Sequence, residues 1–336
     1  MTDHRARRRR RSFFRRHRLA MTSLLVLVGV VITGVGALTI FGLTTIRSAE
    51  DALDDVGTLT DYAGRPAPAT DGSVNLLLLG SDSREPVDER DLAGSGPRRA
   101  DTIMVAHIAA DRHSVELVSI PRDTWVEVPG HGQAKVNAAL AWGGVPLQTR
   151  TIEALTGARI DHAAVVDFGG VESIVATLGA VTVQNDVEFR RGDRVFAEGA
   201  VTLDGPSALE YVRERYAFAD GDFQRMRNQR ALVAGITDRL VSTRTLTDPA
   251  RVSAFVETTA GHIGVDSSWT TSDMIGLGLS LRQLRPSDVT SFTMPVSGTG
   301  TSPDGQSIVV VDDSVLDDLR RAFADDDLEA LSPPAG

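Results

Sequence analysis

Uninterrupted apolar runs, rather than alternating ones, mark the strands of this chain. Three runs, at 74–79, 102–109 and 115–120, have the length of buried strands. Strands that are apolar on both faces are typical of a sheet covered by helices on each side. Three more strands are predicted at 163–168, 289–294 and 308–311. His107 lies inside an apolar strand and is predicted to be a hydrogen-bonded core residue rather than a ligand.

Helical patterns fall between and after these strands. They predict helices over 135–141, 149–155, 171–178, 206–211, 223–241 and 314–323. Pro206 suits the first turn of its helix. In the helix from 223, Met226, Val233, Ile236 and Leu240 form the stripe that faces the core. Strands interspersed with helices predict a single α/β domain of roughly 250 residues.

A long uncharged segment precedes this domain. Residues 19–46 carry no charge, and a helix of this length is long enough to span a bilayer. A cleaved signal peptide would have a shorter apolar region and a cleavage site of small residues. Residues 1–18 hold nine arginines against Asp3, an excess of +8 in a chain whose net charge is -10. A basic flank beside a span predicts a cytoplasmic N-terminus by the positive-inside rule, in preference to a nucleic-acid-binding patch.

The chain is therefore divided into five parts. We expect a basic cytoplasmic tail at 1–18, a transmembrane helix at 19–46, a stalk at 47–72, an extracytoplasmic domain at 73–325 and a disordered tail at 326–336. This predicts a single-pass protein of the cell membrane. The 336 residues are 42% hydrophobic and 24% charged, which is ordinary globular composition. Cysteine is absent, which excludes a disulfide framework, thiolate metal sites and a cysteine nucleophile.

Arginine and aspartate cluster where three predicted strands begin or end. Asp82 and Arg84 follow the first strand, Arg99 and Asp101 precede the second, and Arg122 follows the third. Ligand-binding groups of open α/β sheets gather at strand ends. Each cluster alone is also compatible with a turn that carries a solvated salt bridge.

A fourth and denser cluster spans residues 211–229. Arg213 and Arg215 would point about 200° apart on a continuous helix, so they can share a ligand only if the helix ends near Arg213. Asp222 suits the N-cap of the next helix, on which Arg225 and Gln229 lie on one stripe. Arginines in a first helical turn become favourable when a phosphate binds there.

The chain lacks the phosphate-binding loop of nucleotide hydrolases, the paired-histidine zinc motif and the serine nucleophile elbow. Arginine together with carboxylates predicts a phosphate ester or diphosphate ligand and a hard divalent cation.

Several separated motifs in fixed order resemble the LytR-CpsA-Psr family. They are Asn75–Arg84, Arg99–Thr102, Ser119–Asp123, Lys135–Ala139 with Gly143 and Gly144, and Arg213–Gln229. The resemblance is strong over about 73–242. This sequence departs from the family pattern in having a longer segment between Arg84 and Arg99, which includes residues 86–97.

The resemblance implies an αβα sandwich with a central mixed sheet and a hydrophobic pocket for a polyprenyl chain. It also implies a Mg²⁺-dependent (or Mn²⁺-dependent) phosphotransferase that moves a glycopolymer from a polyprenyl-diphosphate carrier to a peptidoglycan sugar hydroxyl. A polyprenyl-diphosphate hydrolase and a non-catalytic lipid-binding or regulatory envelope protein stay open as alternatives.

Residue roles follow from the same resemblance. It implies that Asp82 and Asp101 bind the metal. The diphosphate-binding or catalytic set that it implies is Arg84, Arg99, Arg122, Arg213, Arg215, Arg225 and Gln229. The catalytic members expected from this set, together with the two aspartates, are Arg122, Arg213 and Arg225. The expected partners are the carrier-linked glycan, peptidoglycan and the membrane, without nucleic acid.

Overall fold

The computed structural model describes residues 54–55, 59, 61–81, 100–218, 222–241, 263–270, 273, 277, 280–281, 284–285 and 288–331. The predicted cytoplasmic tail and membrane span lie outside these ranges, as does the 86–97 segment. Among the helices of the described part, none is both long enough and apolar enough to cross a membrane.

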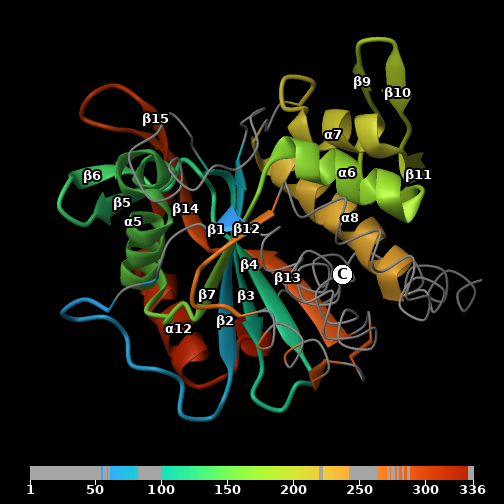
Figure 1. Cartoon of the computed structure of the whole chain (residues 1–336). Helices are drawn as coiled ribbons and strands as arrows, with labels where there is room; N and C mark the ends of the chain where they lie inside the picture. The colour runs from blue at the N-terminus through green and yellow to red at the C-terminus, as the bar shows by residue number, and fades with distance from the viewer. Residues whose placement is uncertain are drawn as a thin grey trace, which may run out of the picture.

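A seven-stranded mixed sheet forms the centre of the molecule (Figure 1). Its strands lie in the order β1 (Asp54–Asp55), β12 (Ile263–Val265), β7 (His162–Val166), β2 (Val74–Ser81), β3 (Ala100–Ile108), β4 (Val115–Ser119) and β13 (Val289–Thr293). β3 is antiparallel to both β2 and β4, whereas β7 is parallel to β2 and β13 is parallel to β4. The predicted α/β class with a mixed sheet is confirmed.

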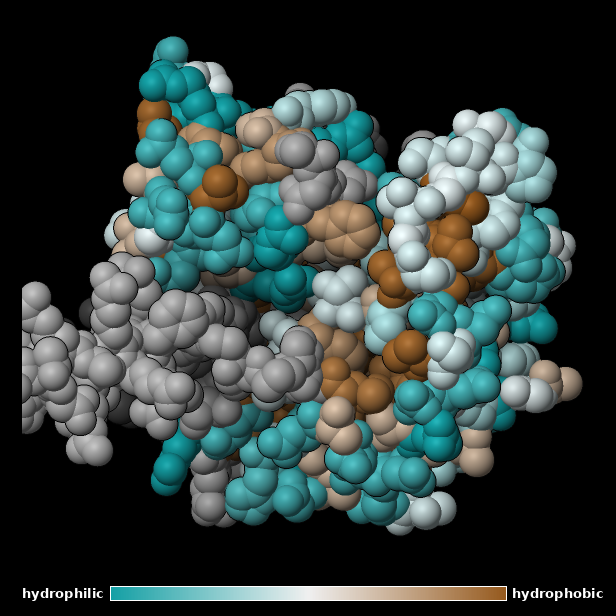
Figure 2. All heavy atoms as spheres, turned by 180° about the vertical axis from the view of Figure 1, so that it is seen from behind, coloured by the Kyte–Doolittle hydropathy of each residue, from teal (hydrophilic) through white to brown (hydrophobic). Residues whose placement is uncertain are grey.

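Helices cover both faces of this sheet (Figure 1). On one side lie α6 (Phe168–Leu178), α7 (Gly205–Arg213) and α8 (Asp222–Val241), and on the other lie α5 (Ala138–Thr156) and α12 (Asp313–Ala324). Strand β2 contributes Leu76 and Leu78 to the core on the first side, and Leu77 and Leu79 to the core on the second. The uninterrupted apolar run thus arises because the strand is buried on both faces. Seen from behind, the surface is mostly hydrophilic, with hydrophobic atoms gathered in recesses (Figure 2).

Four two-stranded sheets surround the central one. They pair β5 (Trp125–Val128) with β6 (Gly132–Lys135), β8 (Val181–Asn185) with β11 (Gly199–Leu203), β9 (Phe189–Arg191) with β10 (Arg194–Phe196), and β14 (Val296–Thr301) with β15 (Ser307–Val311). The predicted strand at 308–311 is therefore present, but it pairs with β14 in a separate sheet. The β9–β10 hairpin projects from the side of the molecule that carries α7 (Figure 1).

The two helices predicted at 135–141 and 149–155 correspond to the two halves of α5, which a kink divides. Lys135 ends β6, and α5 then runs from Ala138 to Thr156. The backbone leaves helical geometry at Gly143 and Gly144, and Gly144 has a φ of 64°. This conformation suits glycine, because it has no Cβ to clash. The predicted division between two helical segments is confirmed, and it falls at this kink.

Two features of the arginine-rich segment are as predicted. Helix α7 begins with a capping box in which Asp204 accepts a hydrogen bond from the backbone N–H of Ser207, with proline in its first turn. The helix ends at Arg213, because Glu214 adopts an extended conformation. Helix α8 begins at Asp222, whose side chain lies outside the described part.

A buried polar row crosses the sheet between β2, β3 and β4. Asn75 lies beside His107, and His107 beside Glu116. His107 contacts Asn75 Oδ1 through Nδ1 at 2.8 Å and Asp326 Oδ1 through Nε2 at 2.7 Å. Burial lowers the pKa of His107. His107 is a hydrogen-bonded core residue, as predicted, and the segment predicted as a disordered tail begins with a residue bonded to it.

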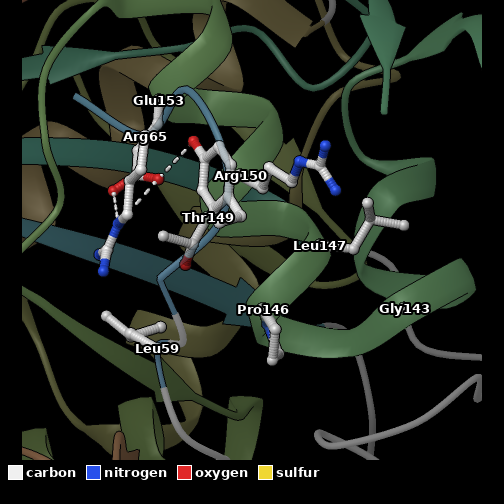
Figure 3. Close-up of a pocket in the computed structure, with 9 residues that line it drawn as sticks. Leu59, Arg65, Gly143, Pro146, Leu147, Thr149, Arg150 and Glu153 are labelled. Atoms are coloured by element: carbon white, nitrogen blue, oxygen red, sulfur yellow. Dashed lines mark hydrogen bonds and ion pairs between the residues drawn. The ribbon is translucent and has the colours of Figure 1, made fainter. Parts of the chain in front are cut away.

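Part of the predicted stalk packs against the domain. Arg65 donates from Nε to Glu153 Oε1 of α5 at 3.0 Å, and Tyr62 donates from its hydroxyl to Glu153 Oε2 at 2.7 Å. The Glu153 side chain is fully buried and that of Arg65 is 7% exposed. Beside this group lies a cavity of about 240 Å³ between residues 59–65 and α5, where Arg150 lies over the Tyr62 ring (Figure 3).

We predict that this buried ion pair makes a large contribution to stability. Arg65→Ala leaves the Glu153 carboxylate buried without its cation, so the free energy of unfolding should fall by about 3–5 kcal/mol. Asp61→Ala is the matched control, because Asp61 also binds Arg65 but its side chain is 79% exposed. Because water screens an exposed carboxylate, its removal should lower the free energy of unfolding far less. Urea denaturation of both variants gives the comparison, and equal small losses would contradict the buried pair.

Glu116 provides a pH-dependent prediction. Burial raises the pKa of its carboxyl from 4.5 to about 7. The folded protein therefore holds this proton more tightly than the unfolded chain, and stability is lost as pH rises from 4.5 through 7. At about 1.4 kcal/mol per pKa unit, the loss is about 3 kcal/mol.

Glu116→Gln should remove this loss, so the variant should gain stability over the wild type at pH 8 but not at pH 4.5. The exposed Glu127→Gln serves as the control. Denaturation midpoints across this pH range measure the effect. Parallel curves for the wild type and Glu116→Gln would show that the carboxyl titrates normally.

Candidate functional site

Strand polarity brings several of the predicted residues to one edge of the sheet. β2 and β4 run in the same direction and end at Ser81 and Ser119, and β13 ends at Thr293 directly beside Ser119. The antiparallel β3 begins at this edge, with Ala100 paired to Ser81. Asp101 and the loop that starts after β4 therefore lie at the same end of neighbouring strands.

Arg122 and Asp101 form an ion pair at this edge. Nη1 of Arg122 donates to Oδ1 of Asp101, and the side chains are 18% and 15% exposed. The backbone reaches this position through a tight turn, in which the N–H of Thr124 donates to the carbonyl of Pro121 at 3.0 Å. Two clusters that are 21 residues apart in the sequence thus form one charged group.

Asp123 and Lys135 extend this charged group. Nζ of Lys135 lies 2.9 Å from Oδ1 of Asp123, and Nε of Arg122 lies 3.5 Å from Oδ2 of the same carboxylate. The β5–β6 hairpin brings Lys135 here, because the N–H of Val136 donates to the carbonyl of Thr124 at 2.8 Å. Charges alternate from Lys135 through Asp123 and Arg122 to Asp101.

Lys135 and Asp123 were absent from the predicted site residues. Asp123 stands directly after Arg122 in the sequence, and Lys135 is the only lysine of the chain. Its place in the Lys135–Ala139 motif was the signal that could have assigned it to the site.

Arg213 and Arg215 flank the point where α7 ends. Glu214 is extended, so the two arginines are no longer on a common helix. Nη2 of Arg215 donates to the Tyr216 hydroxyl at 2.7 Å, and its guanidinium lies 4.6 Å from the centre of the Tyr216 ring. The Tyr216 side chain is exposed. The helix thus ends near Arg213, which is the condition under which the two arginines can share a ligand.

Helix α8 carries Arg225 and Gln229, which are both buried. The Gln229 Oε1 atom is buried and accepts no hydrogen bond from the described residues. Asn228 Nδ2 donates to the carbonyl of Tyr211 at 3.3 Å, which ties α8 to the end of α7. A buried amide oxygen without a donor is costly, so Gln229 is suited to accept one from a ligand or a water molecule.

Arg230 connects α8 to the edge of the sheet. Its Nη1 donates to Thr293 Oγ1 at 3.0 Å, at the end of β13. Burial lowers the pKa of Arg230, and the positive charge of the neighbouring Arg227 lowers it further. The contact places this part of α8 beside the strand end from which the Arg122 loop begins.

Three predicted site residues, Asp82, Arg84 and Arg99, lie outside the described residues. Within the described part, no group of three or more acidic or histidine side chains is arranged to hold a metal ion. Of the two predicted metal ligands, Asp101 is described, and its carboxylate has the oxygen donors that suit a hard cation. Chemically, this edge of the sheet offers guanidinium and ammonium groups held by carboxylates, a set that suits an anionic ligand.

Comparison with known proteins identifies the family of this chain. The LytR_cpsA_psr family model matches residues 44–324. The cell wall biosynthesis protein LcpA of Corynebacterium glutamicum is 31% identical over 336 aligned residues, which cover 88% of this chain and 62% of that protein. The polyisoprenyl-teichoic acid–peptidoglycan teichoic acid transferase TagU of Bacillus cereus is 32% identical, with 67% of this chain and 72% of that protein covered.

Solved structures give the same fold. TagV of B. subtilis superposes with a TM-score of 0.64 at 22% identity, over 77% of this chain and 98% of that one. TagT bound to LIIa-WTA superposes with a TM-score of 0.61 at 26% identity, over 80% and 96% of the two chains. Fold and site define an α/β protein with an arginine-rich edge of the sheet. The chain belongs to the LytR-CpsA-Psr family.

Proposed function

We propose that this protein is a phosphotransferase of cell-wall assembly, which transfers a glycopolymer from a polyprenyl-diphosphate carrier to a sugar hydroxyl of peptidoglycan. The observation that carries the proposal is the ionic chain through Arg122 at the carboxyl ends of the strands, beside α8. The name of the TagU relative and the LIIa-WTA bound to TagT support the same substrate class.

Arg122 has the central role in this proposal. Asp101 and Asp123 contact its guanidinium from two sides, so it is held before substrate binds. A planar guanidinium can bind two phosphate oxygens at once. Phosphoryl transfer depends on alignment and charge neutralisation, which a fixed cation provides without reorganisation.

The remaining arginines and Gln229 bind the rest of the diphosphate. Arg213 and Arg215 approach from the end of α7, and Arg225 and Gln229 from α8. The hydroxyl oxygen of the acceptor sugar attacks the phosphorus next to the glycan, and a new phosphate ester bond forms. The bond from this phosphorus to the bridging oxygen breaks, polyprenyl phosphate leaves with the electron pair, and the hydroxyl proton passes to a base.

A divalent cation, Mg²⁺ or Mn²⁺, belongs to the same proposal. Asp101 would hold it together with Asp82, and when bound it would neutralise charge on the diphosphate oxygens. The hydrophobic pocket for the polyprenyl chain, the membrane anchor at 19–46 and the extracytoplasmic position of the domain are parts of this proposal too, since the carrier lipid lies in the membrane.

We predict that Arg122→Ala lowers glycopolymer transfer at least about 100-fold, because one preorganised charge at the reacting group is lost. The full chain in detergent is incubated with polyprenyl-diphosphate-linked glycan, Mg²⁺ and a peptidoglycan acceptor, and products are identified by mass spectrometry. Arg122→Lys keeps the charge but not the fork of donors and should retain part of the activity.

Arg321→Ala is the control, because Arg321 lies on α12 with a side chain that is 72% exposed. Full activity of Arg122→Ala would contradict the assigned role. Release of free glycan phosphate by the wild type, without acceptor linkage, would instead identify a hydrolase. Absence of any product would favour a lipid-binding or regulatory protein.

A further inference from the structure

Glu214 lies between Arg213, the last residue of α7, and Arg215, and it is buried. Its Oε1 accepts hydrogen bonds from three consecutive backbone N–H groups, those of Arg215, Tyr216 and Ala217, at 3.0, 2.8 and 3.0 Å. A single carboxylate oxygen thus holds the backbone that leaves the helix. The direction in which Arg215 departs from α7 is set by this side chain.

The second oxygen of Glu214 binds a different part of the chain. Arg191, at the end of β9, donates from Nη1 to Oε2 at 3.0 Å. The side chains of Arg191 and Glu214 are 34% and 9% exposed, so water screens this ion pair only partly. The charge-assisted bonds from Arg191 and the three amides satisfy both oxygens of the carboxylate.

The hairpin that carries Arg191 is itself fixed to α7. Phe189 and Phe196 stack with ring centres 4.6 Å apart, and Tyr211 of α7 lies 5.6 and 5.5 Å from these two rings. All three residues are buried. Arg191 therefore extends from a rigid base, and its contact with Glu214 connects the projecting hairpin to the arginine-bearing turn.

We propose that Glu214 and Arg191 are positioning residues for the diphosphate site: they hold the Arg213–Ala217 turn so that Arg213 and Arg215 bind the same diphosphate. This inference rests on the proposed function. The carboxylate also offsets the mutual repulsion of guanidinium groups two residues apart. Without Glu214, the three N–H groups lose their acceptor and the turn samples other conformations, which reduces the fraction of molecules ready to bind.

Binding of inorganic pyrophosphate to the full chain in detergent, measured by calorimetry, tests the inference. Arg191→Ala and Glu214→Ala should each weaken binding about 10-fold. Glu214→Gln keeps an oxygen that can accept from the amides, so it should fall in between, and Arg191→Lys should restore part of the affinity. The matched control is Arg190→Ala, because Arg190 precedes Arg191 on the same strand but is exposed.

A second readout separates positioning from a general loss of structure. Amide hydrogen exchange at residues 215–217 should accelerate in Arg191→Ala and Glu214→Ala, while exchange in the central strands β2 and β4 stays as in the wild type. In the transfer assay, KM for the carrier lipid should rise more than kcat falls. Arg191→Ala removes only one donor from outside the turn, so it keeps the test informative if Glu214→Ala fails to fold.

The outcomes distinguish this inference from the proposed function. Suppose that the wild type binds pyrophosphate and that Arg191→Ala and Glu214→Gln bind it with the same affinity as the control Arg190→Ala. This result would overturn the positioning role alone. A wild type that binds no pyrophosphate and transfers no glycopolymer would overturn the proposed function, and with it the purpose assigned to the turn. Unchanged amide exchange at 215–217 in Arg191→Ala would overturn the coupling of the hairpin to the turn.

Discussion

Guanidinium groups repel one another, and a site built from several of them forms only where carboxylates hold each in place. The ion pair of Arg122 with Asp101 meets this requirement at the centre of the site, with Asp123 and Lys135 extending the alternation of charge. Glu214 does the same for the turn that carries Arg213 and Arg215. Each of these carboxylates lies next to the cation that it holds, in sequence or across the edge of the sheet.

The sheet makes this arrangement possible. Because β2 and β4 end where β3 begins, the ends of three neighbouring strands meet at a single edge. Cores on both faces hold the strands, and the Arg230–Thr293 contact brings α8 to the same edge. The apolar layers therefore fix the positions of the charged loops, and the ligand need not assemble them.

Local sequence patterns predicted the central strands well, because a strand buried on both faces must be apolar throughout. They also predicted the helix over 206–211, which ends two residues later, at Arg213. The break at Gly143 and Gly144 was also predicted, whereas the first helix starts at Ala138 and not at Lys135, which ends β6. Contacts between distant segments have no periodic signal. The bonds of Arg191 to Glu214, of Arg230 to Thr293 and of Arg65 to Glu153 join residues 23, 63 and 88 positions apart, and only the folded chain reveals them.

A crystal structure of the protein with a non-hydrolysable polyprenyl-diphosphate analogue tests the central claim most directly. Both phosphates should lie at the carboxyl ends of β2 and β4, within hydrogen-bonding distance of the guanidinium groups of Arg122 and Arg213. Density for the diphosphate elsewhere, for example in the cavity beside Tyr62 and Arg150, with Arg122 still bound only to its carboxylates, would contradict it.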